Sequence, residues 1–133
     1  MSVDDRIQSF LASDSFAVVG ASSDRSKFGN KVLRCYQQHG KKVYPINPRA
    51  EELEGLKAYP SLASLPEKVA AISVITPPAI TEQVVRDAAA AGVKHVWMQP
   101  GADSEAAVRA AESLGLSVIA GGPCLLVVLG FRG

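Results

Sequence analysis

The sequence predicts one α/β domain built on a doubly wound parallel sheet with helices on both faces. Short apolar runs alternate with stretches in which apolar residues recur every three or four positions, the patterns of buried strands and amphipathic helices. The connections between these elements are too short to contain a second core. We therefore expect residues 1–133 to form a single domain.

The composition is that of an ordinary globular protein and argues against several classes of function. Apolar residues make up 47% and charged residues 20% of the 133-residue chain, whose formal net charge is +1. Nucleic acids and anionic membranes bind clustered basic surfaces, so neither is expected as a partner. No basic start precedes an apolar run, and no apolar stretch approaches the roughly 20 residues that cross a bilayer. We expect a cytoplasmic protein without membrane association.

The first expected helix covers residues 3–12. Its apolar residues Ile7, Phe10 and Leu11 share one face. Two acidic residues stand near its amino-terminal end, where the helix dipole favours negative charge. This helix is expected to pack beneath the first strand.

Residues 16–30 pass from an apolar strand through a loop of small and polar residues into a second helix, expected at 29–39. Gly20 allows the sharp turn, and the unpaired N–H groups at the start of the helix point to the same place. Lys27 and Lys31 add positive charge. This order predicts a Rossmann-like site for a phosphorylated ligand. The alternative is a turn that holds no ligand.

Two departures from the dinucleotide fingerprint argue against NAD. Ser22 stands where G-x-G-x-x-G has its second glycine, and the next glycine, Gly29, comes late. The second strand, expected at 43–46, leads into an Asn-Pro-Arg sequence at 47–49. An acid at this point would hold the ribose of NAD, so the ligand is expected to be a different phosphorylated molecule.

Residues 50–65 predict a surface loop at the sheet edge, with an extended piece at 58–59 and a turn of helix at 61–65. The next run, at 70–75, is apolar apart from one serine, as a central strand covered on both faces should be. Thr76 and two prolines end it.

Two further pairs of helix and strand complete the alternation. We expect a helix from residue 80 to Gly92, a strand at 94–98, a helix capped by Asp103 or Ser104 and ended by Gly115, and a strand at 117–119. Each helix carries its apolar residues on one face: Ile80, Val84, Ala88 and Ala91 in the first, and Ala107, Ala110, Ala111 and Leu114 in the second.

The apolar residues 125–129 allow two interpretations. We favour a last buried strand. The alternative is a contact between two copies of the chain in a homodimer.

Parallel strands place their carboxyl ends on one edge of the sheet, where ligands of such folds bind. The strand exits that meet there are rich in glycine, proline, serine, threonine and amide side chains: residues 20–27, 47–49, 76–78, 99–101 and 121–124. They contain no pair of acids and no Ser-His-Asp order, and His95 is expected on the opposite edge. Cys35 and Cys124 form no metal-binding pattern. We therefore expect a binding site with neither catalytic residues nor a metal.

Five motifs in order give the chain a specific resemblance. They are residues 18–22, 27–30, 43–48, 55–62 and 96–101. Together they resemble the small single-domain CoA-binding proteins, which are related to the CoA-binding domain of the succinyl-CoA synthetase α subunit. The resemblance covers almost the whole chain. It implies a Rossmann-like domain that binds coenzyme A or an acyl-CoA.

The resemblance also implies which residues bind the cofactor. The loop after the first strand is expected to receive the diphosphate, and Arg49 is the candidate for the 3′-phosphate of the nucleotide. The predicted cofactor-binding residues are Gly20, Ala21, Ser22, Ser23, Asp24, Arg25, Lys27, Phe28, Gly29, Asn47, Pro48, Arg49, Thr76, Pro77, Trp97, Met98 and Gln99. Residues 75–78 and 122–125 differ from the common pattern of the small proteins, at the pantetheine end of the site.

The resemblance predicts a binding protein without ligase activity, because the phosphorylated histidine of the synthetases lies in another domain. Two other functions are open: an NAD(P)-dependent oxidoreductase-like domain, and a module that senses a ligand or assembles with a partner. Cys124 likewise has two interpretations. It is either a small buried hydrophobic residue or a thiol that forms a mixed disulfide with CoA.

Overall fold

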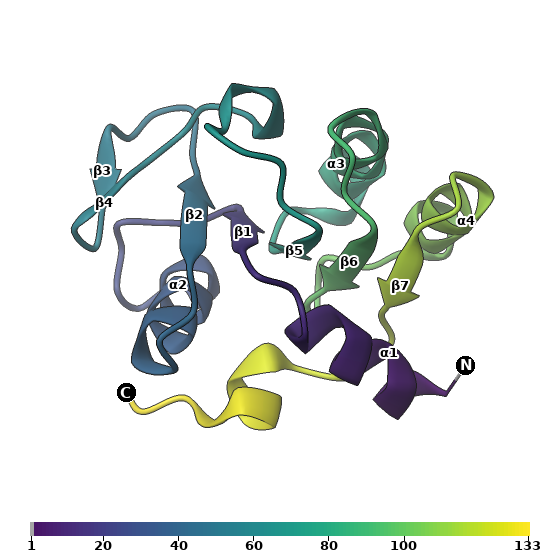
Figure 1. Cartoon of the computed structure of the whole chain (residues 1–133), viewed down its shortest axis with the longest axis horizontal. Helices are drawn as coiled ribbons and strands as arrows, with labels where there is room; N and C mark the ends of the chain where they lie inside the picture. Colours follow the sequence, from purple (N-terminus) through teal and green to yellow (C-terminus); the bar gives the residue numbers. More distant parts are fainter. Residues whose placement is uncertain (1) are drawn as a thin grey trace.

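The computed structural model describes residues 2–133, and its central layer is a five-stranded parallel sheet (Figure 1). The strand order is β2-β1-β5-β6-β7, so the order reverses between β1 and β5. This single-domain, Rossmann-like α/β architecture confirms the predicted fold class. The strands are β1 (Phe16–Val19), β2 (Val43–Ile46), β5 (Ala71–Val74), β6 (His95–Met98) and β7 (Ser117–Ile119).

Helices cover both faces of the sheet (Figure 1). One face carries α1 (Val3–Leu11), α2 (Phe28–Gln38) and the C-terminal segment; the other carries α3 (Pro78–Ala90), α4 (Glu105–Ser113) and the short 3₁₀ helix η1 (Leu62–Ser64). Alternate strand residues supply the two cores, because successive side chains of a strand point to opposite faces. Val18 and Trp97 pack with α1 and α2, whereas Val19 and Met98 pack with α3 and α4.

Helix α1 forms where it was predicted. Ser2 and Asp5 make a reciprocal cap at its start. Phe10 is fully buried and contacts Phe16 of β1, with ring centroids 5.5 Å apart. Its ring also packs in a T-shaped arrangement with that of Trp97, with ring centroids 5.2 Å apart. The helix therefore lies beneath β1 as expected, and its contacts extend across the sheet to β7, where Arg6 Nη1 donates to the carbonyl of Val118 at 3.3 Å.

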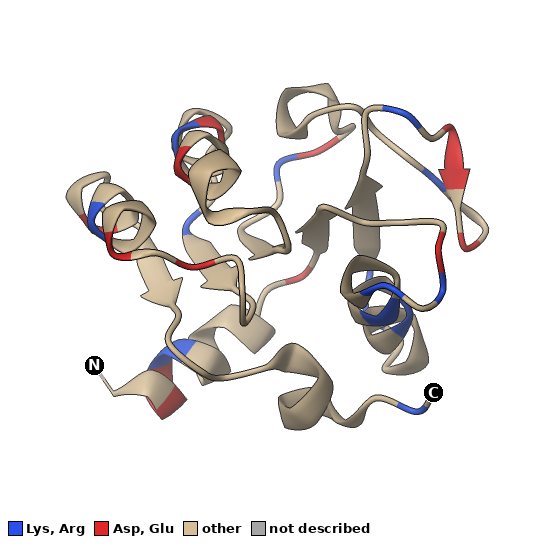
Figure 2. Ribbon diagram, turned by 180° about the vertical axis from the view of Figure 1, so that it is seen from behind, with Lys and Arg blue, Asp and Glu red and all other residues tan. Residues whose placement is uncertain are grey.

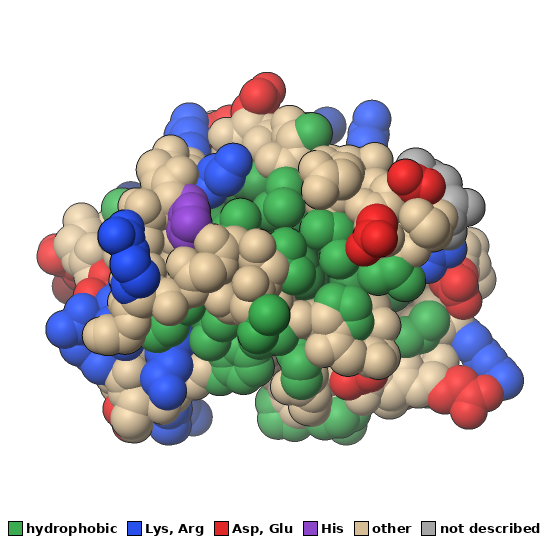
Figure 3. All heavy atoms as spheres, turned by 90° about the horizontal axis from the view of Figure 1, so that it is seen from below, with side chains coloured by type: hydrophobic (Ala, Val, Ile, Leu, Met, Phe, Trp, Pro, Cys, Tyr) green, Lys and Arg blue, Asp and Glu red, His purple; other side chains and the backbone are tan. Residues whose placement is uncertain are grey.

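The prediction of a last buried strand at 125–129 is wrong. Leu125 is buried, but the chain then forms one wide helical turn, η2 (Leu126–Gly130), that packs on α2. A sixth parallel strand would need a crossover of about a dozen residues, and the five residues 120–124 are too few. Val127 is 79% exposed, and hydrophobic side chains gather on this face of the molecule (Figure 3). The homodimer contact remains a prediction.

Residues 50–65 contain more structure than the predicted surface loop. A hairpin of two short strands, β3 (Glu52–Leu53) and β4 (Leu56–Lys57), turns at Glu54 and Gly55, both of which have positive φ angles. The extended piece at 58–59 is confirmed by the pairing of Tyr59 with Ile46. The predicted turn of helix is η1.

The remaining elements lie close to their predicted positions. Ser104 caps α4 by accepting from the N–H of Ala107 at 3.0 Å. Leu114, expected on the buried face of this helix, is instead 45% exposed, because it follows the last helical residue. Within residues 2–133, no helix has the length and apolar character needed to cross a membrane.

Candidate functional site

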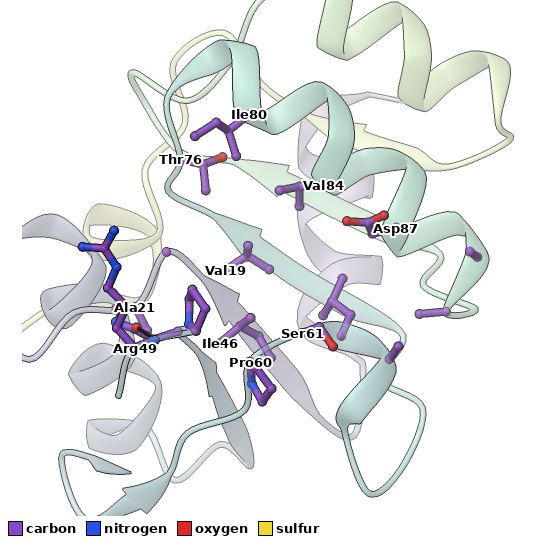
Figure 4. A pocket seen from close by; sticks show the side chains of 17 residues that line it. Val19, Ala21, Ile46, Arg49, Pro60, Ser61, Thr76, Ile80, Val84 and Asp87 are labelled. Atoms are coloured by element: carbon purple, nitrogen blue, oxygen red, sulfur yellow. Dashed lines mark hydrogen bonds between the residues drawn. The ribbon is translucent and has the colours of Figure 1, made fainter. Parts of the chain in front are cut away.

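A cavity of about 670 Å³ opens at the carboxyl edge of the sheet, beside the point where the strand order reverses (Figure 4). Its floor is formed by the ends of β1 and β2, one wall by α3, and the other wall by the segment that leads into η1. In open α/β sheets this reversal point is the usual binding place for ligands. The cavity is thus where the sequence analysis expects the site.

The lining of the cavity is mainly apolar. Val19 and Ile46 come from the strands, and Ile80 and Val84 from α3 (Figure 4). Leu62 of η1 also lines the cavity. Ile80 was expected on the buried face of its helix, but it is 52% exposed and borders the cavity instead. Such a surface suits an apolar part of a ligand.

Polar groups surround this apolar lining. Arg49 comes from the exit of β2, Thr76 from the exit of β5, and Asp87 from the C-terminal part of α3 (Figure 4). Asn47 also comes from the exit of β2. Of the predicted cofactor-binding residues, the cavity brings together Gly20, Ala21, Asn47, Pro48, Arg49 and Thr76.

Residues 20–29, which we call the phosphate loop, begin and end at tightly packed glycines. Gly20 has a φ of +95°, and a Cβ there would lie 2.3 Å from the carbonyl oxygen of Ile75. A Cβ on Gly29 would lie 2.1 Å from the carbonyl oxygen of Gly20. Both positions therefore require glycine, and the start of α2 packs directly against the loop.

Side chains of the phosphate loop accept hydrogen bonds from the backbone of the same loop. Ser22 Oγ accepts from the N–H of Asp24 at 3.0 Å. One carboxylate oxygen of Asp24 accepts from the hydroxyl of Ser26 at 2.6 Å and from its N–H at 2.9 Å. These hydrogen bonds hold the pKa of Asp24 below its usual value, the hydroxyl contributing most. The Asp24 carboxylate thus stabilises the phosphate loop itself.

Two asparagines fix the phosphate loop from outside. Asn47 Nδ2 donates to the carbonyl of Ala21 at 2.9 Å, which links the exits of β1 and β2. Asn30 Nδ2 donates to the carbonyl of Ser22, also at 2.9 Å. Asn30 ends the motif 27–30 but was not among the predicted cofactor-binding residues; in the structure it is fully buried, and a buried amide needs hydrogen-bond partners.

The β3–β4 hairpin completes this arrangement. A carboxylate oxygen of Glu54 accepts from Asn30 Nδ2 at 2.9 Å and lies 3.5 Å from Arg25 Nε. Arg34 donates to Asn30 Oδ1 at 2.7 Å and to the carbonyl of Arg25 at 3.1 Å. Basic segments of α2 and the loop therefore lie near the acidic hairpin (Figure 2). These contacts depend on the hairpin, which the sequence does not predict.

The other predicted residues of the exits of β1 and β5 lie around the phosphate loop or at helix starts. Ser23, Arg25 and Lys27 are exposed, and Lys27 precedes α2 without capping it by its side chain. Phe28 is partly buried against the core beneath the sheet. Pro77 stands immediately before α3.

The structure does not bring the side chains of residues 97–99 to the cavity. Trp97 Nε1 donates to the carbonyl of Pro123 at 3.0 Å, and Gln99 Oε1 accepts from the N–H of Leu125 at 2.9 Å. Met98 is buried in the core beneath α3 and α4. The C-terminal segment thus packs over the exit of β6, where it bonds Trp97 Nε1 and Gln99 Oε1, while Gln99 Nε2 is buried without a hydrogen-bond partner among residues 2–133.

The histidines and cysteines among residues 2–133 do not line the cavity. His95 starts β6 at the opposite edge of the sheet, and burial lowers its pKa. His39 Nε2 is 2.9 Å from the carbonyl oxygen of Gly130, just beyond the end of α2. Cys35 is buried and Cys124 is partly buried. Among the described residues, no three His, Cys, Asp or Glu side chains gather in a metal-binding group.

Comparison with known proteins connects this geometry to a family and to known structures. The family described as "CoA binding domain" matches residues 14–130. A hypothetical protein from Pyrococcus horikoshii OT3 superimposes with a TM-score of 0.88 at 31% identity, over 96% of this chain and 89% of that one. A conserved hypothetical protein from Pyrococcus furiosus gives 0.80 at 40% identity, over 86% and 97%.

The curated relatives are much longer than this chain. The α subunit of acetate–CoA ligase (ADP-forming) II from Pyrococcus furiosus is 38% identical over 81 residues, which is 60% of this chain and 18% of the relative. The chain therefore spans less than a fifth of that protein. Coenzyme A, the cofactor predicted from the sequence, is the ligand for which the matched family is named. The chain belongs to the CoA-binding domain family.

Proposed function

We propose that this protein binds coenzyme A, free or acylated, and carries out no chemistry of its own on it. The nucleoside lies in the apolar cavity, the diphosphate lies on the phosphate loop, and Arg49 contacts the 3′-phosphate. The observation that supports this most strongly is continuity: Gly20 and Ala21 belong both to the cavity lining and to the start of the phosphate loop. A nucleotide could therefore contact both at once.

A nicotinamide nucleotide fits the same site less well. The exit of β2 offers Asn47 where an acid would bind the ribose of NAD, and Asn47 Oδ1 already accepts from the N–H of Arg49 at 2.8 Å. The groups that line the cavity include one acid, Asp87, and no histidine, cysteine, lysine or tyrosine that could serve a redox reaction.

Ligase activity requires more than this chain. The curated ligase subunit is more than five times as long as the aligned segment. Binding without catalysis is therefore the activity that we assign to the chain by itself, in a cytoplasmic setting.

Isothermal titration calorimetry tests this function. At low salt we expect micromolar or tighter binding of CoA, and much weaker binding of NADH and NADPH. Incubation with acetate, ATP and CoA should yield no acetyl-CoA. No heat with CoA, or a preference for NADH, would contradict the assignment of ligand. Turnover would contradict the absence of catalysis.

We also propose that the exposed apolar turn at Val127 and Val128 is the contact used if two copies pair. Sedimentation equilibrium of the wild type and of a Val127→Ser, Val128→Ser variant tests this. A dimer that the double substitution leaves intact, or a wild-type monomer at high concentration, would contradict it.

A further inference from the structure

We infer that Asn30 and Asn47 are positioning residues that aim the main-chain N–H groups of Ser22 and Ser23 at the diphosphate of the bound nucleotide. The inference rests on the proposed function. It assigns the anion contact to two particular N–H groups and gives a part in binding to Asn30, which ends the motif 27–30 but was not among the predicted cofactor-binding residues.

The direction of these N–H groups follows from peptide geometry. In a trans peptide the C=O and the N–H point to opposite sides. Asn47 binds the carbonyl of Ala21, so the N–H of Ser22 in the same peptide points away from Asn47. Asn30 binds the carbonyl of Ser22, so the N–H of Ser23 points away from Asn30. Two consecutive N–H groups are thereby turned away from the side chains that hold their peptides.

These two N–H groups are available to a ligand. Among residues 2–133, neither the N–H of Ser22 nor that of Ser23 has a protein hydrogen-bond acceptor. By contrast, the N–H groups of Asp24 and Ser26 are bonded to side chains of the loop, and the N–H of Lys27 donates to the carbonyl of Asp24 at 3.0 Å. Consecutive free N–H groups beside the start of a helix form an anion-binding concavity.

Both asparagines are held in one orientation. The side-chain oxygen of Asn30 accepts from Arg34 Nε at 2.7 Å, and its Nδ2 also donates to Glu54. The side-chain oxygen of Asn47 accepts from the N–H of Arg49 at 2.8 Å. Each amide therefore presents its nitrogen to the phosphate loop. The loop is preorganised, which reduces the cost of ordering it when an anion binds.

Asn30 acts only through the loop, because it is fully buried and cannot touch the ligand. Asn47 lines the cavity, so a substitution there could also remove a direct contact. Asn30→Ala is therefore the more informative variant. Gln37→Ala is its matched control, because Gln37 Nε2 donates to the carbonyl of Glu54 at 3.0 Å and makes no hydrogen bond to the phosphate loop.

The first experiment measures affinity for CoA, ADP and adenosine by calorimetry. We expect Asn30→Ala to weaken CoA and ADP by about tenfold, the typical value of a hydrogen bond to a charged group, while adenosine changes less than twofold. Asn47→Ala should also weaken ADP more than adenosine, and Gln37→Ala should change none of the three by more than about twofold. Equal losses for ADP and adenosine in Asn30→Ala would overturn the inference.

The second experiment needs no variant and reads the amides directly. In ¹H–¹⁵N NMR spectra of the wild type, inorganic pyrophosphate should shift the Ser22 and Ser23 amide protons downfield more than those of Asp24 and Ser26. Were Asn30→Ala to unfold, as circular dichroism would reveal, this spectrum and Asn47→Ala decide the matter. CoA binding with no response at Ser22 and Ser23 overturns the inference but leaves the function standing. A wild type that binds no CoA overturns both.

Discussion

Arg49 stands at the rim of the cavity, exposed, and no carboxylate among residues 2–133 pairs with its guanidinium. Its main chain is fixed by Asn47, so its side chain starts from a defined position beside the phosphate loop. A free guanidinium binds phosphate oxygens strongly and with defined geometry. This residue is therefore the one most able to recognise the 3′-phosphate that distinguishes CoA from dephospho-CoA.

Replacing Arg49 by alanine should separate these two ligands. We expect Arg49→Ala to weaken CoA by about tenfold and dephospho-CoA by less than about twofold, because only CoA loses a charge-assisted contact. Arg86→Ala is the control, since Arg86 is exposed on α3 and does not line the cavity. Calorimetry with both ligands gives the ratio. Equal losses would remove Arg49 from the 3′-phosphate role.

Cys35 gives a prediction of pH dependence. Burial raises the pKa of its thiol from its ordinary value of 9.0 to about 11, and Cys124 adds to this effect. Between these pH values the unfolded chain has lost a proton that the native protein keeps, so the free energy of unfolding falls as the pH rises. Cys35 should contribute up to roughly 2–3 kcal/mol to this fall.

Urea unfolding at a series of pH values between 9 and 11 measures the effect. Burial also raises the pKa of Tyr36, so the quantity of interest is the difference between the wild type and Cys35→Ala. This difference should shrink steadily as the pH rises through the interval. A difference independent of pH would show that the thiol is not shielded from ionisation as its burial implies.

At the scale of elements, one face of α3 both packs on the sheet and lines the cavity. Val84 and Ala88 are buried against the sheet, while Ile80, one turn earlier than Val84, is half exposed and borders the cavity. An apolar residue at this spacing predicts the same helix in either case. Whether such a residue contacts the sheet or borders a cavity depends on the segment opposite the helix, which here is η1. The position of that segment could not be predicted from the sequence of α3 alone.

A charge at position 80 should therefore harm binding more than folding. We expect Ile80→Asp to weaken CoA by tenfold or more, because it places a carboxylate beside the bound ring and near the phosphates, with little change in melting temperature. Leu114→Asp introduces the same charge at an equally exposed position after α4, outside the cavity. The control should bind CoA normally, and comparable losses in both variants would count against this assignment.

At the scale of the whole molecule, the order of elements could be predicted because each strand is short, apolar and covered on both faces, as at residues 71–74. The edge that carries the site followed from the parallel sheet. The hairpin could not be predicted from two-residue strands, and the C-terminal apolar run was assigned wrongly because a strand and a helical turn share its composition.

The residues of the candidate site likewise divide into those that could be predicted from the sequence and those that could not. Gly20, Asn47 and Arg49 follow strand exits and could be found from the sequence. Asn30, Arg34 and Glu54 could not, because their contacts join α2 to a hairpin 24 residues further along the chain. The C-terminal segment over Trp97 and Gln99 was also beyond sequence reasoning, since it depends on where the chain turns after β7.

The most direct measurement is a crystal structure of the protein with coenzyme A. We predict that the diphosphate lies within hydrogen-bonding distance of the N–H groups of Ser22 and Ser23, with the adenine ring between Ile46 and Ile80 and the 3′-phosphate at Arg49. A complex in which coenzyme A is bound elsewhere, with residues 20–29 free of phosphate and the cavity beside α3 empty, would contradict this account.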